Sequence, residues 1–312
     1  LRDSGLTVNP AQILVTNGGK HAVATTFMTL VDPGDEVLIP APYWTTYPEA
    51  VYLAGGKPVA VPTSEANGFR VTVEELEKYR TPKTKLLVFV SPSNPTGAVC
   101  TPEQVAEIGR WAAEHNIWVM CDEIYEHLVY GNARHVSLPV VAPEIGDRFV
   151  VVNGVAKTYA MTGWRMGYSV WPKPLYDAAR KLAVNSFSCV NASAQYAGLE
   201  ALTGPQDAVH AMVQEFDRRR KVVIEGLNKL PNVSAATPKG AFYAFPNISK
   251  TGWRAKPLAS ALLEEAGVAT IGGPDFGVYG EGFIRLSYAN STENILRALE
   301  RIEKFLNERA QK

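Results

Sequence analysis

Short, almost wholly apolar runs alternate with amphipathic segments along the first part of the chain. Four runs have the length and the β-branched composition of strands: Glu36–Ile39, Lys85–Val90, Ile117–Cys121 and Arg148–Val152. Because they are nearly continuous in apolar residues, they predict strands that are buried on both faces. Strands separated by helices in this rhythm predict an α/β fold with a mostly parallel sheet flanked by helices.

The clearest helix signal lies between the second and third of these runs. Thr101 can cap a helix, Pro102 suits its first turn, and Gln104 stands where the partner of a capping box belongs. The apolar positions that follow predict a helix that ends near His115-Asn116.

The pattern changes after about Ala201, where Thr203-Gly204-Pro205 interrupts the chain. The later segments predict a long helix over 208–230, an aromatic run over 240–245, a helix near 257–266, a strand over 283–288 and a final helix over 292–308. We therefore expect a large domain over residues 1–205 and a smaller C-terminal α+β domain over 206–312, with the boundary in the long helix. The basic cluster Arg218-Arg219-Arg220-Lys221 on that helix is expected to be a solvated face.

Composition and charge narrow the class of protein. The 312 residues are 46% hydrophobic and 20% charged, which is ordinary for a soluble globular enzyme. Lys plus Arg and Asp plus Glu are both 31, so the sequence has no basic footprint for nucleic acid or an anionic membrane. No apolar run has the length of a membrane helix, and Leu1–Gly5 does not resemble a signal peptide.

The cysteines and histidines predict neither disulfides nor a metal site. Cys100, Cys121 and Cys189 are odd in number and widely spaced, which indicates reduced thiols and a cytoplasmic protein. The five histidines share no ligand spacing with cysteine or carboxylate, so no metal is expected.

Unusual polar residues follow the predicted strands, at the sheet edge where ligands bind in open α/β folds. Asp122 comes directly after an apolar strand, and Asn94 and Lys157 lie in the turns after two others. Gly18-Gly19-Lys20 follows the run Ile13–Thr16 and precedes a helix, so its backbone N–H groups could receive a phosphate. Each feature alone is most often a cap, a turn or a surface charge. Together, in chain order, they predict one site.

Five motifs resemble those of the class I aminotransferases, and they occur in the family's order. They are Pro40-Ala41-Pro42-Tyr43-Trp44, Asn94-Pro95-Thr96-Gly97, Cys121-Asp122-Glu123-Ile124-Tyr125, the run from Ala156 to Tyr168, and Ile284-Arg285-Leu286-Ser287-Tyr288. The resemblance spans nearly the whole chain and is closest to bacterial aspartate aminotransferases of the I-gamma subgroup. It implies a fold type I transferase whose large domain binds pyridoxal 5'-phosphate.

The resemblance also implies roles around the cofactor. Lys157 matches the lysine that carries the cofactor and then serves as general base at the substrate α-carbon. Asp122 matches the carboxylate that pairs with the ring nitrogen, and Tyr125 and Asn94 match the donors to the ring oxygen. Trp44 matches the aromatic ring stacked on the cofactor, and Trp44 and Asn94 also border the substrate.

Phosphate and substrate contacts follow from the same motifs. Arg165 matches the arginine that holds the phosphate, with the backbone of Gly19 and Lys20 beside it. Arg285 matches the arginine that binds the substrate α-carboxylate in a bidentate manner. Lys20 either contacts the distal carboxylate of a dicarboxylic substrate, as in the resembled subgroup, or only lies beside the phosphate. Glu123 is expected to face away from the cofactor as a structural partner.

The implied reaction is transamination of L-amino acids to 2-oxo acids by a ping-pong mechanism through pyridoxamine phosphate. Lys20 favours aspartate and glutamate, with oxaloacetate and 2-oxoglutarate as keto partners. The alternatives are an aromatic or prephenate aminotransferase, or a carbon–sulfur lyase, because the same Lys157, Asp122 and Arg285 serve them all. Another alternative is a truncated domain without turnover.

Two departures from the family accompany the resemblance. Gly154 and Ala156 stand where many relatives carry phosphate-binding serines, so the phosphate contacts would rest mainly on Arg165 and the backbone near Gly19. Leu1–Thr7 resembles the end of an interior helix, so the family's N-terminal arm, a glycine-containing loop and a tyrosine that reaches the partner's phosphate are expected to be missing. The expected assembly is a homodimer, weakened if the arm is absent.

Overall fold

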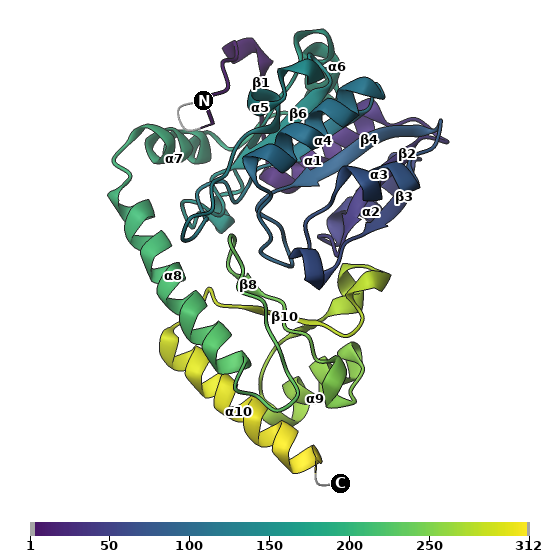
Figure 1. Cartoon of the computed structure of the whole chain (residues 1–312). Helices are drawn as coiled ribbons and strands as arrows, with labels where there is room; N and C mark the ends of the chain where they lie inside the picture. Colours follow the sequence, from purple (N-terminus) through teal and green to yellow (C-terminus); the bar gives the residue numbers. More distant parts are fainter. Residues whose placement is uncertain (1–3, 311–312) are drawn as a thin grey trace.

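The computed structural model describes residues 4–310 and places a large helix-flanked sheet above a small sheet, with helix α8 running from one to the other (Figure 1). Residues 1–3, on which part of the expectation about a missing arm rests, lie outside this range. The strands are β1 (Ile13–Thr16), β2 (Glu36–Ala41), β3 (Lys57–Pro62), β4 (Thr84–Val90), β5 (Trp118–Asp122), β6 (Phe149–Gly154), β7 (Gly167–Val170), β8 (Tyr243–Ala244), β9 (Ile271–Gly272) and β10 (Ile284–Ser287). The α-helices are α1 (Gly19–Leu30), α2 (Thr46–Leu53), α3 (Val73–Tyr79), α4 (Pro102–Glu114), α5 (Leu138–Val141), α6 (Lys173–Phe187), α7 (Ala192–Thr203), α8 (Asp207–Leu227), α9 (Ala255–Ala266) and α10 (Thr292–Ala310).

The large sheet is mostly parallel, as the sequence predicted. Within the described residues it has seven strands in the order β1-β7-β6-β5-β4-β2-β3. Only β7 opposes its neighbours, pairing antiparallel with both β1 and β6. The other strands therefore point the same way, and the carboxyl ends of β1, β2, β4, β5 and β6 meet at one edge. Ligands bind at such an edge in open α/β sheets.

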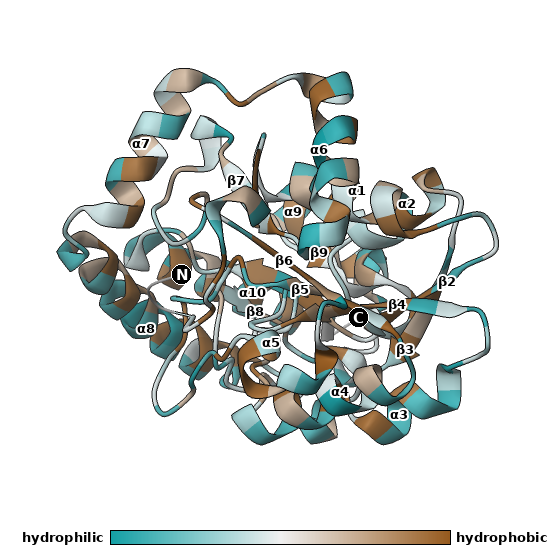
Figure 2. Ribbon diagram, turned by 90° about the horizontal axis from the view of Figure 1, so that it is seen from above, coloured by the Kyte–Doolittle hydropathy of each residue, from teal (hydrophilic) through white to brown (hydrophobic). Residues whose placement is uncertain are grey.

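The sheet is buried on both faces because its strands send apolar side chains to both sides. On β4, Leu87 and Phe89 pack into one core together with the apolar face of α4. Leu86 and Val88 face the opposite core with Phe27 of α1. Figure 2 shows the apolar strands at the centre and hydrophilic segments on the surrounding helices. The strand assignments made from continuous apolar runs are confirmed.

The helix predicted between two of these strands is confirmed with its cap. Helix α4 has Thr101 as N-cap, and the side chains of Thr101 and Gln104 bond each other's backbone N–H in a capping box. Pro102 occupies the first turn, where its missing N–H is no loss. The helix ends at Glu114, one residue before the expected His115.

The small sheet contains β8, β10 and β9, paired antiparallel. Helices α8 and α10 lie side by side against it (Figure 1), and they share a core that includes Ile224 and Leu227 of α8 and Leu299 and Ile302 of α10. This core also contains Tyr125, which lies in the turn after β5 of the large sheet. The small sheet is thereby held against the edge where the parallel strands end.

One expectation about the long helix is wrong for a single residue. Arg218 and Lys221 are exposed and form ion pairs with Glu215 and Asp217, as on a solvated helix face. Arg220 is instead buried, donates to the Pro238 carbonyl oxygen at 3.1 Å and pairs with Asp217 at 2.6 Å. The long guanidinium can be buried because these two partners satisfy it.

No helix in the described range 4–310 has both the length and the apolar character that crossing a membrane requires.

Candidate active site

A cavity of about 330 Å³ lies at the carboxyl edge of the large sheet and is closed on one side by residues of the small sheet. All nine site residues predicted from the sequence line it: Gly19, Lys20, Trp44, Asn94, Asp122, Tyr125, Lys157, Arg165 and Arg285. They lie at or just after the carboxyl ends of β1, β2, β4, β5 and β6 and, for Arg285, on β10. The convergence follows directly from the parallel strands, whose ends share one edge.

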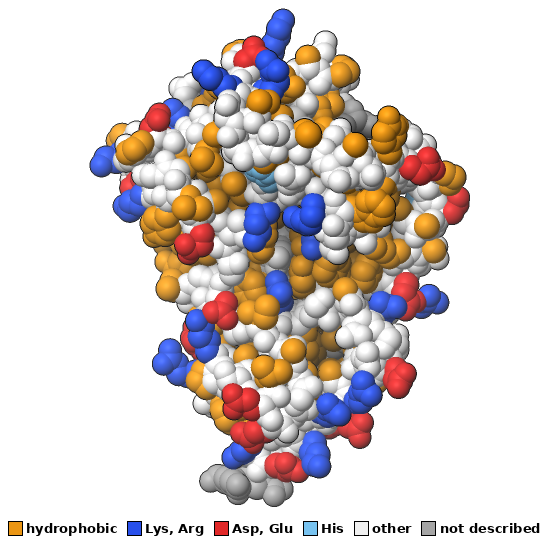
Figure 3. All heavy atoms as spheres, turned by 180° about the vertical axis from the view of Figure 1, so that it is seen from behind, with side chains coloured by type: hydrophobic (Ala, Val, Ile, Leu, Met, Phe, Trp, Pro, Cys, Tyr) orange, Lys and Arg blue, Asp and Glu red, His pale blue; other side chains and the backbone are white. Residues whose placement is uncertain are grey.

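Positive charge dominates the cavity. Among the residues that the structure describes, Lys20, Lys157, Arg165 and Arg285 line it, and Asp122 is the one carboxylate beside them. Figure 3 shows Lys and Arg side chains gathered at the middle of one face, between the upper and lower parts of the molecule. In a chain with no net charge, this local excess favours anionic ligands such as phosphates and carboxylates.

Asp122 is a buried carboxylate at the end of β5, with 4% of its surface exposed. Its Oδ2 accepts from the phenol of Tyr47 at 2.7 Å, and its Oδ1 accepts from the backbone N–H of Ile124 at 3.2 Å. Burial raises the pKa of Asp122 to about 6, although these two hydrogen bonds act in the opposite direction. A cationic N–H donor in the cavity would favour the ionised form further.

Lys157 follows β6 and is half-buried, with its Nζ 5.5 Å from the centre of the Phe242 ring. Burial lowers the pKa of Lys157, and the positive charges of Arg285 and Arg165 lower it further, while Asp122 raises it. A lowered pKa increases the fraction of neutral amine, which is the form that attacks carbonyls and accepts protons.

The N-terminus of α1 and Arg165 form an anion cradle. Gly18, the N-cap, has a positive φ of 80° and provides no side-chain cap, so the first N–H groups of the helix are left for a ligand. A Cβ at Gly18 would collide with the Arg165 guanidinium, and a Cβ at Gly167 would collide with the backbone of Gly18 and Gly19. Arg165 is itself fixed by a hydrogen bond from Nη1 to the Thr162 carbonyl oxygen at 2.9 Å.

Arg285 and Asn94 bind each other across the cavity wall. Nη1 of Arg285 donates to Oδ1 of Asn94 at 2.8 Å, which leaves the amide N–H₂ of Asn94 as a donor. The guanidinium stands 4.5 Å from the ring centre of Tyr243 and 4.8 Å from that of Phe276. Its Nε is buried and has no hydrogen-bond partner among the described residues. A buried unsatisfied donor beside two aromatic rings fits a site for a carboxylate.

Trp44 and Lys20 form another wall of the cavity. Nζ of Lys20 lies 5.2 Å from the centre of the Trp44 ring, and the Lys20 side chain is exposed. The ring of Tyr47 meets Trp44 edge-on, with centres 5.3 Å apart, and so fixes its orientation.

Two residues that sequence reasoning missed touch the predicted ones. Tyr47 holds Asp122, and Tyr243 places its Oη 2.9 Å from that of Tyr125. Both are buried tyrosines, whose hydroxyls need hydrogen-bond partners. The sequence alone does not indicate which residues those partners are, because they come from distant parts of the chain.

These residues fit pyridoxal phosphate, the cofactor that the motifs imply. The uncapped helix end and Arg165 suit the phosphate, and the buried Asp122 suits a protonated ring nitrogen. Tyr125 and the free amide of Asn94 can donate to a ring oxygen, and Lys157 offers an amine of lowered pKa.

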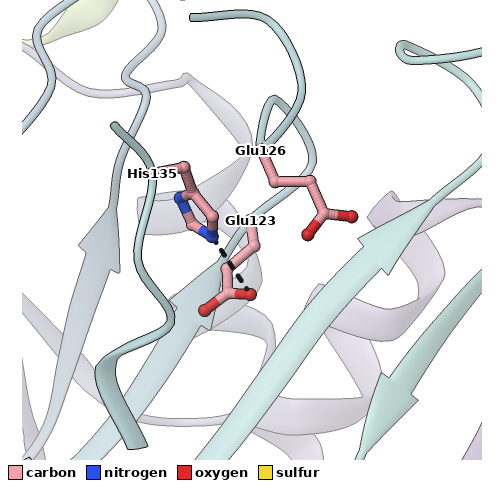
Figure 4. Close-up of side chains that lie close together, drawn as sticks. All are labelled: Glu123, Glu126 and His135. Carbon is pink, nitrogen blue, oxygen red and sulfur yellow. Dashed lines mark ion pairs between the residues drawn. The ribbon is translucent and has the colours of Figure 1, made fainter. Parts of the chain in front are cut away.

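A cluster of two glutamates and one histidine includes Glu123, the residue that follows Asp122 in the chain, and its side chains are drawn in Figure 4. Ligand-type atoms of Glu123, Glu126 and His135 lie within 4.8 Å of one another. Nε2 of His135 is 3.5 Å from Oε2 of Glu123, while Ser137 donates to the other Glu123 oxygen at 2.6 Å. Nδ1 of His135 faces the Ser91 carbonyl oxygen at 3.0 Å. Glu123 is thus the structural partner that was expected, and His135 ties the turn that carries Asn94 to the end of β5.

Replacing His135 with alanine is expected to lower the free energy of unfolding by about 3 kcal/mol, because it leaves the buried Glu123 carboxylate without its cation. Burial alone would lower the pKa of His135, but Glu123 outweighs it and raises the pKa. The stabilisation is therefore fully present below the unfolded pKa of about 6.5 and is lost as pH rises through the folded value. Urea unfolding of both proteins across this pH range measures the difference.

The matched control for that experiment is His115→Ala, which removes a more exposed histidine paired with Glu77. The decrease in the free energy of unfolding should be much smaller in His115→Ala than in His135→Ala. Equal losses for the two variants, or a His135 effect that grows with pH, would contradict the ion-pair explanation.

Comparison with known proteins agrees with the geometry of the site. The sequence model of the family described as "Aminotransferase class I and II" matches residues 1–302. The chain is 53% identical to an aspartate aminotransferase of Streptomyces avermitilis, over 99% of this chain and 77% of that protein. Its structure matches that of an aromatic aminotransferase from Pyrococcus horikoshii with a TM-score of 0.96 and 42% identity, over 99% of this chain and 83% of that one. It also matches the structure of Thermus thermophilus aspartate aminotransferase with maleate, with a TM-score of 0.91 and 43% identity, over 97% of this chain and 78% of that one.

Proposed function

The chain belongs to the class I and II aminotransferases, which are pyridoxal-phosphate-dependent enzymes, and we propose that it moves the amino group of aspartate or glutamate to a 2-oxo acid. The observation that carries the proposal is one cavity lined by Lys157, Asp122 and Arg285. The 53% identical Streptomyces protein is named an aspartate aminotransferase, which supports the same donor here.

Pyridoxal phosphate, when bound, supplies an electron sink for breaking the bond between the substrate α-carbon and its hydrogen. The neutral amine of Lys157 would take that proton as a general base and return it, as a general acid, to the carbon of the cofactor that carried the aldehyde. Asp122 would keep the ring nitrogen protonated by its negative charge, and Tyr125 and Asn94 would donate to the ring oxygen. Arg165 and the N-terminus of α1 would hold the phosphate, and Trp44 would offer its ring as a stacking partner.

Substrate selection rests on two cations in this proposal. Arg285 binds the α-carboxylate that every amino acid carries, with its unsatisfied Nε available for a second hydrogen bond. Lys20 stands at the exposed side of Trp44 and binds the distal carboxylate of aspartate or glutamate. The Thermus relative whose structure was solved with maleate, a dicarboxylate, supports this assignment.

A second candidate is transamination of aromatic amino acids. The Pyrococcus relative of TM-score 0.96 is named an aromatic aminotransferase, and the ring of Trp44 borders the cavity that Lys20 also lines. An aromatic side chain could stack there in place of an ion pair with Lys20.

The proposal extends to organisation and assembly. A division into a cofactor domain over 1–205 and a small domain over 206–312 is supported by the two separate sheets. A cytoplasmic location is supported by the thiols of Cys100 and Cys121, which are free and buried. A homodimer is supported by the exposed apolar side chains of Tyr196 and Leu199 on α7, which a partner subunit could cover. The cluster at Glu123 is assigned to a structural ion pair and not to a metal.

The visible absorbance of the purified chain with pyridoxal phosphate, recorded before and after L-aspartate, tests the proposal. We expect a protein-bound band that is replaced by the pyridoxamine phosphate spectrum when aspartate is added. A bound band that responds only to phenylalanine or tyrosine would favour the aromatic candidate. Absence of any bound band would reject the function for this chain.

A further inference from the structure

Tyr243 stands between the proposed cofactor site and the proposed substrate site. It lies on β8 of the small sheet, yet it lines the cavity with Lys157 and Arg285. Its ring faces the Arg285 guanidinium at 4.5 Å, and its Oη lies 2.9 Å from the Oη of Tyr125. None of the motifs in the sequence assigns it a role.

The two phenols have a fixed number of protons to donate. Each hydroxyl donates one hydrogen bond and can accept others, and in the free chain either of the two can be the donor. Burial raises the pKa of Tyr125 and of Tyr243, so both keep their protons at neutral pH. The charged groups that face Tyr125 are Asp122 and Arg285, and Arg285 also faces Tyr243.

Binding of the cofactor removes the choice of donor. Once Tyr125 gives its only proton to the ring oxygen, its contact with Tyr243 persists only if Tyr243 donates. A hydroxyl that accepts a hydrogen bond becomes the stronger donor, because neighbouring bonds in a chain polarise one another.

We propose that Tyr243 is a positioning residue that donates to Tyr125 and thereby strengthens the hydrogen bond from Tyr125 to the cofactor's ring oxygen. The order of donation is Tyr243 to Tyr125 to the ring oxygen. The Arg285 guanidinium packs against the Tyr243 side chain. The group proposed to bind the substrate carboxylate therefore also fixes the position of the residue that strengthens the hydrogen bond to the cofactor's ring oxygen. The inference rests on the proposed function and adds to it a residue that acts through Tyr125.

A pH titration of the bound cofactor's visible absorbance tests the proposal without turnover. The midpoint reports the proton shared between the lysine-linked nitrogen and the ring oxygen, and a donor to that oxygen lowers the midpoint by stabilising its negative charge. Tyr125→Phe should raise the midpoint by about one pH unit, the value of one hydrogen bond to a charged group. Tyr243→Phe should raise the midpoint by about 0.3 pH unit, because the hydrogen bond from Tyr125 to the ring oxygen remains and loses only the added strength that Tyr243 gives it.

The double variant and a control make the test specific. In a Tyr125→Phe background, Tyr243→Phe should cause no further shift, because its effect passes through the missing hydroxyl. Tyr288→Phe is the matched control: Tyr288 is buried in the same core, and its hydroxyl bonds the Ala241 carbonyl oxygen at 3.1 Å. It should leave the midpoint unchanged.

Two results would overturn the proposal while leaving the proposed function intact. One is an unchanged midpoint in Tyr243→Phe, and the other is an equal Tyr243→Phe shift with and without the Tyr125 hydroxyl. A wild-type chain that binds no cofactor would instead reject the proposed function, and this inference with it.

Discussion

Replacing Lys157 with alanine is expected to slow amino transfer by about 10⁴-fold, the upper range of the effect of a positioned general base. Burial and two guanidinium groups lower the pKa of Lys157, and the other lysine that lines the cavity, Lys20, lies exposed beside Trp44 and so is not expected to replace it. Added pyridoxal phosphate should still bind through Arg165 and Asp122, because those contacts do not involve Lys157. The rate of the half-reaction with aspartate, measured in a single turnover, gives the loss.

The same variant tests both roles proposed for Lys157, which are to carry the cofactor covalently and to act as the general base. Borohydride reduction followed by mass spectrometry should locate the cofactor on Lys157 in the parent chain and nowhere in the variant. Lys78→Ala is the matched control, because Lys78 is an exposed surface lysine paired with Glu74. Near-parental turnover in Lys157→Ala would remove this residue from the mechanism.

The sequence predicted the central sheet and the site because both depend on local signals that tertiary packing reinforces. A strand buried on both faces is apolar throughout, as in β4 and β5, so its run of residues is visible without a partner. Parallel strands end at one edge, so Asn94, Asp122 and Lys157 could be placed together from their positions after three strands.

Residues that act through contacts between distant segments were not predictable in this way. Tyr47 follows the Trp44 motif by three residues, but only folding brings its hydroxyl to Asp122, 75 positions away. Tyr243 meets Tyr125 across 118 positions. Arg220 looked like part of a charged surface because the carbonyl oxygen that satisfies it, on Pro238, belongs to another segment. Periodicity and motif spacing report neighbours along an element, not such pairs.

Replacing Arg285 with alanine is expected to lower kcat/KM by about 10²–10³-fold for every amino-acid substrate, the usual loss when a buried, hydrogen-bonded charge pair is broken. The α-carboxylate is common to all of them, and Arg285 is the arginine that the small sheet contributes to the cavity. Lys20→Ala is the contrasting variant. Lys20 is exposed, so its loss should cost at most about five-fold and only for dicarboxylic substrates. If Arg285→Ala lowered kcat/KM only for dicarboxylic substrates, Arg285 would instead be assigned to the distal carboxylate and Lys20 to the α-carboxylate.

Arg285→Ala should also move the pH dependence of the half-reaction. After burial, the positive charge of Arg285 is the largest cause of the lowered pKa of Lys157. Removing it raises that pKa, so less of the amine is neutral at a given pH and the acidic limb of the rate profile shifts to higher pH. Lys20→Ala should leave the limb in place, since Lys20 is not among the groups that shift the pKa of Lys157. A profile that shifts equally in both variants would mean that substrate binding, and not the ionisation of Lys157, sets the limb.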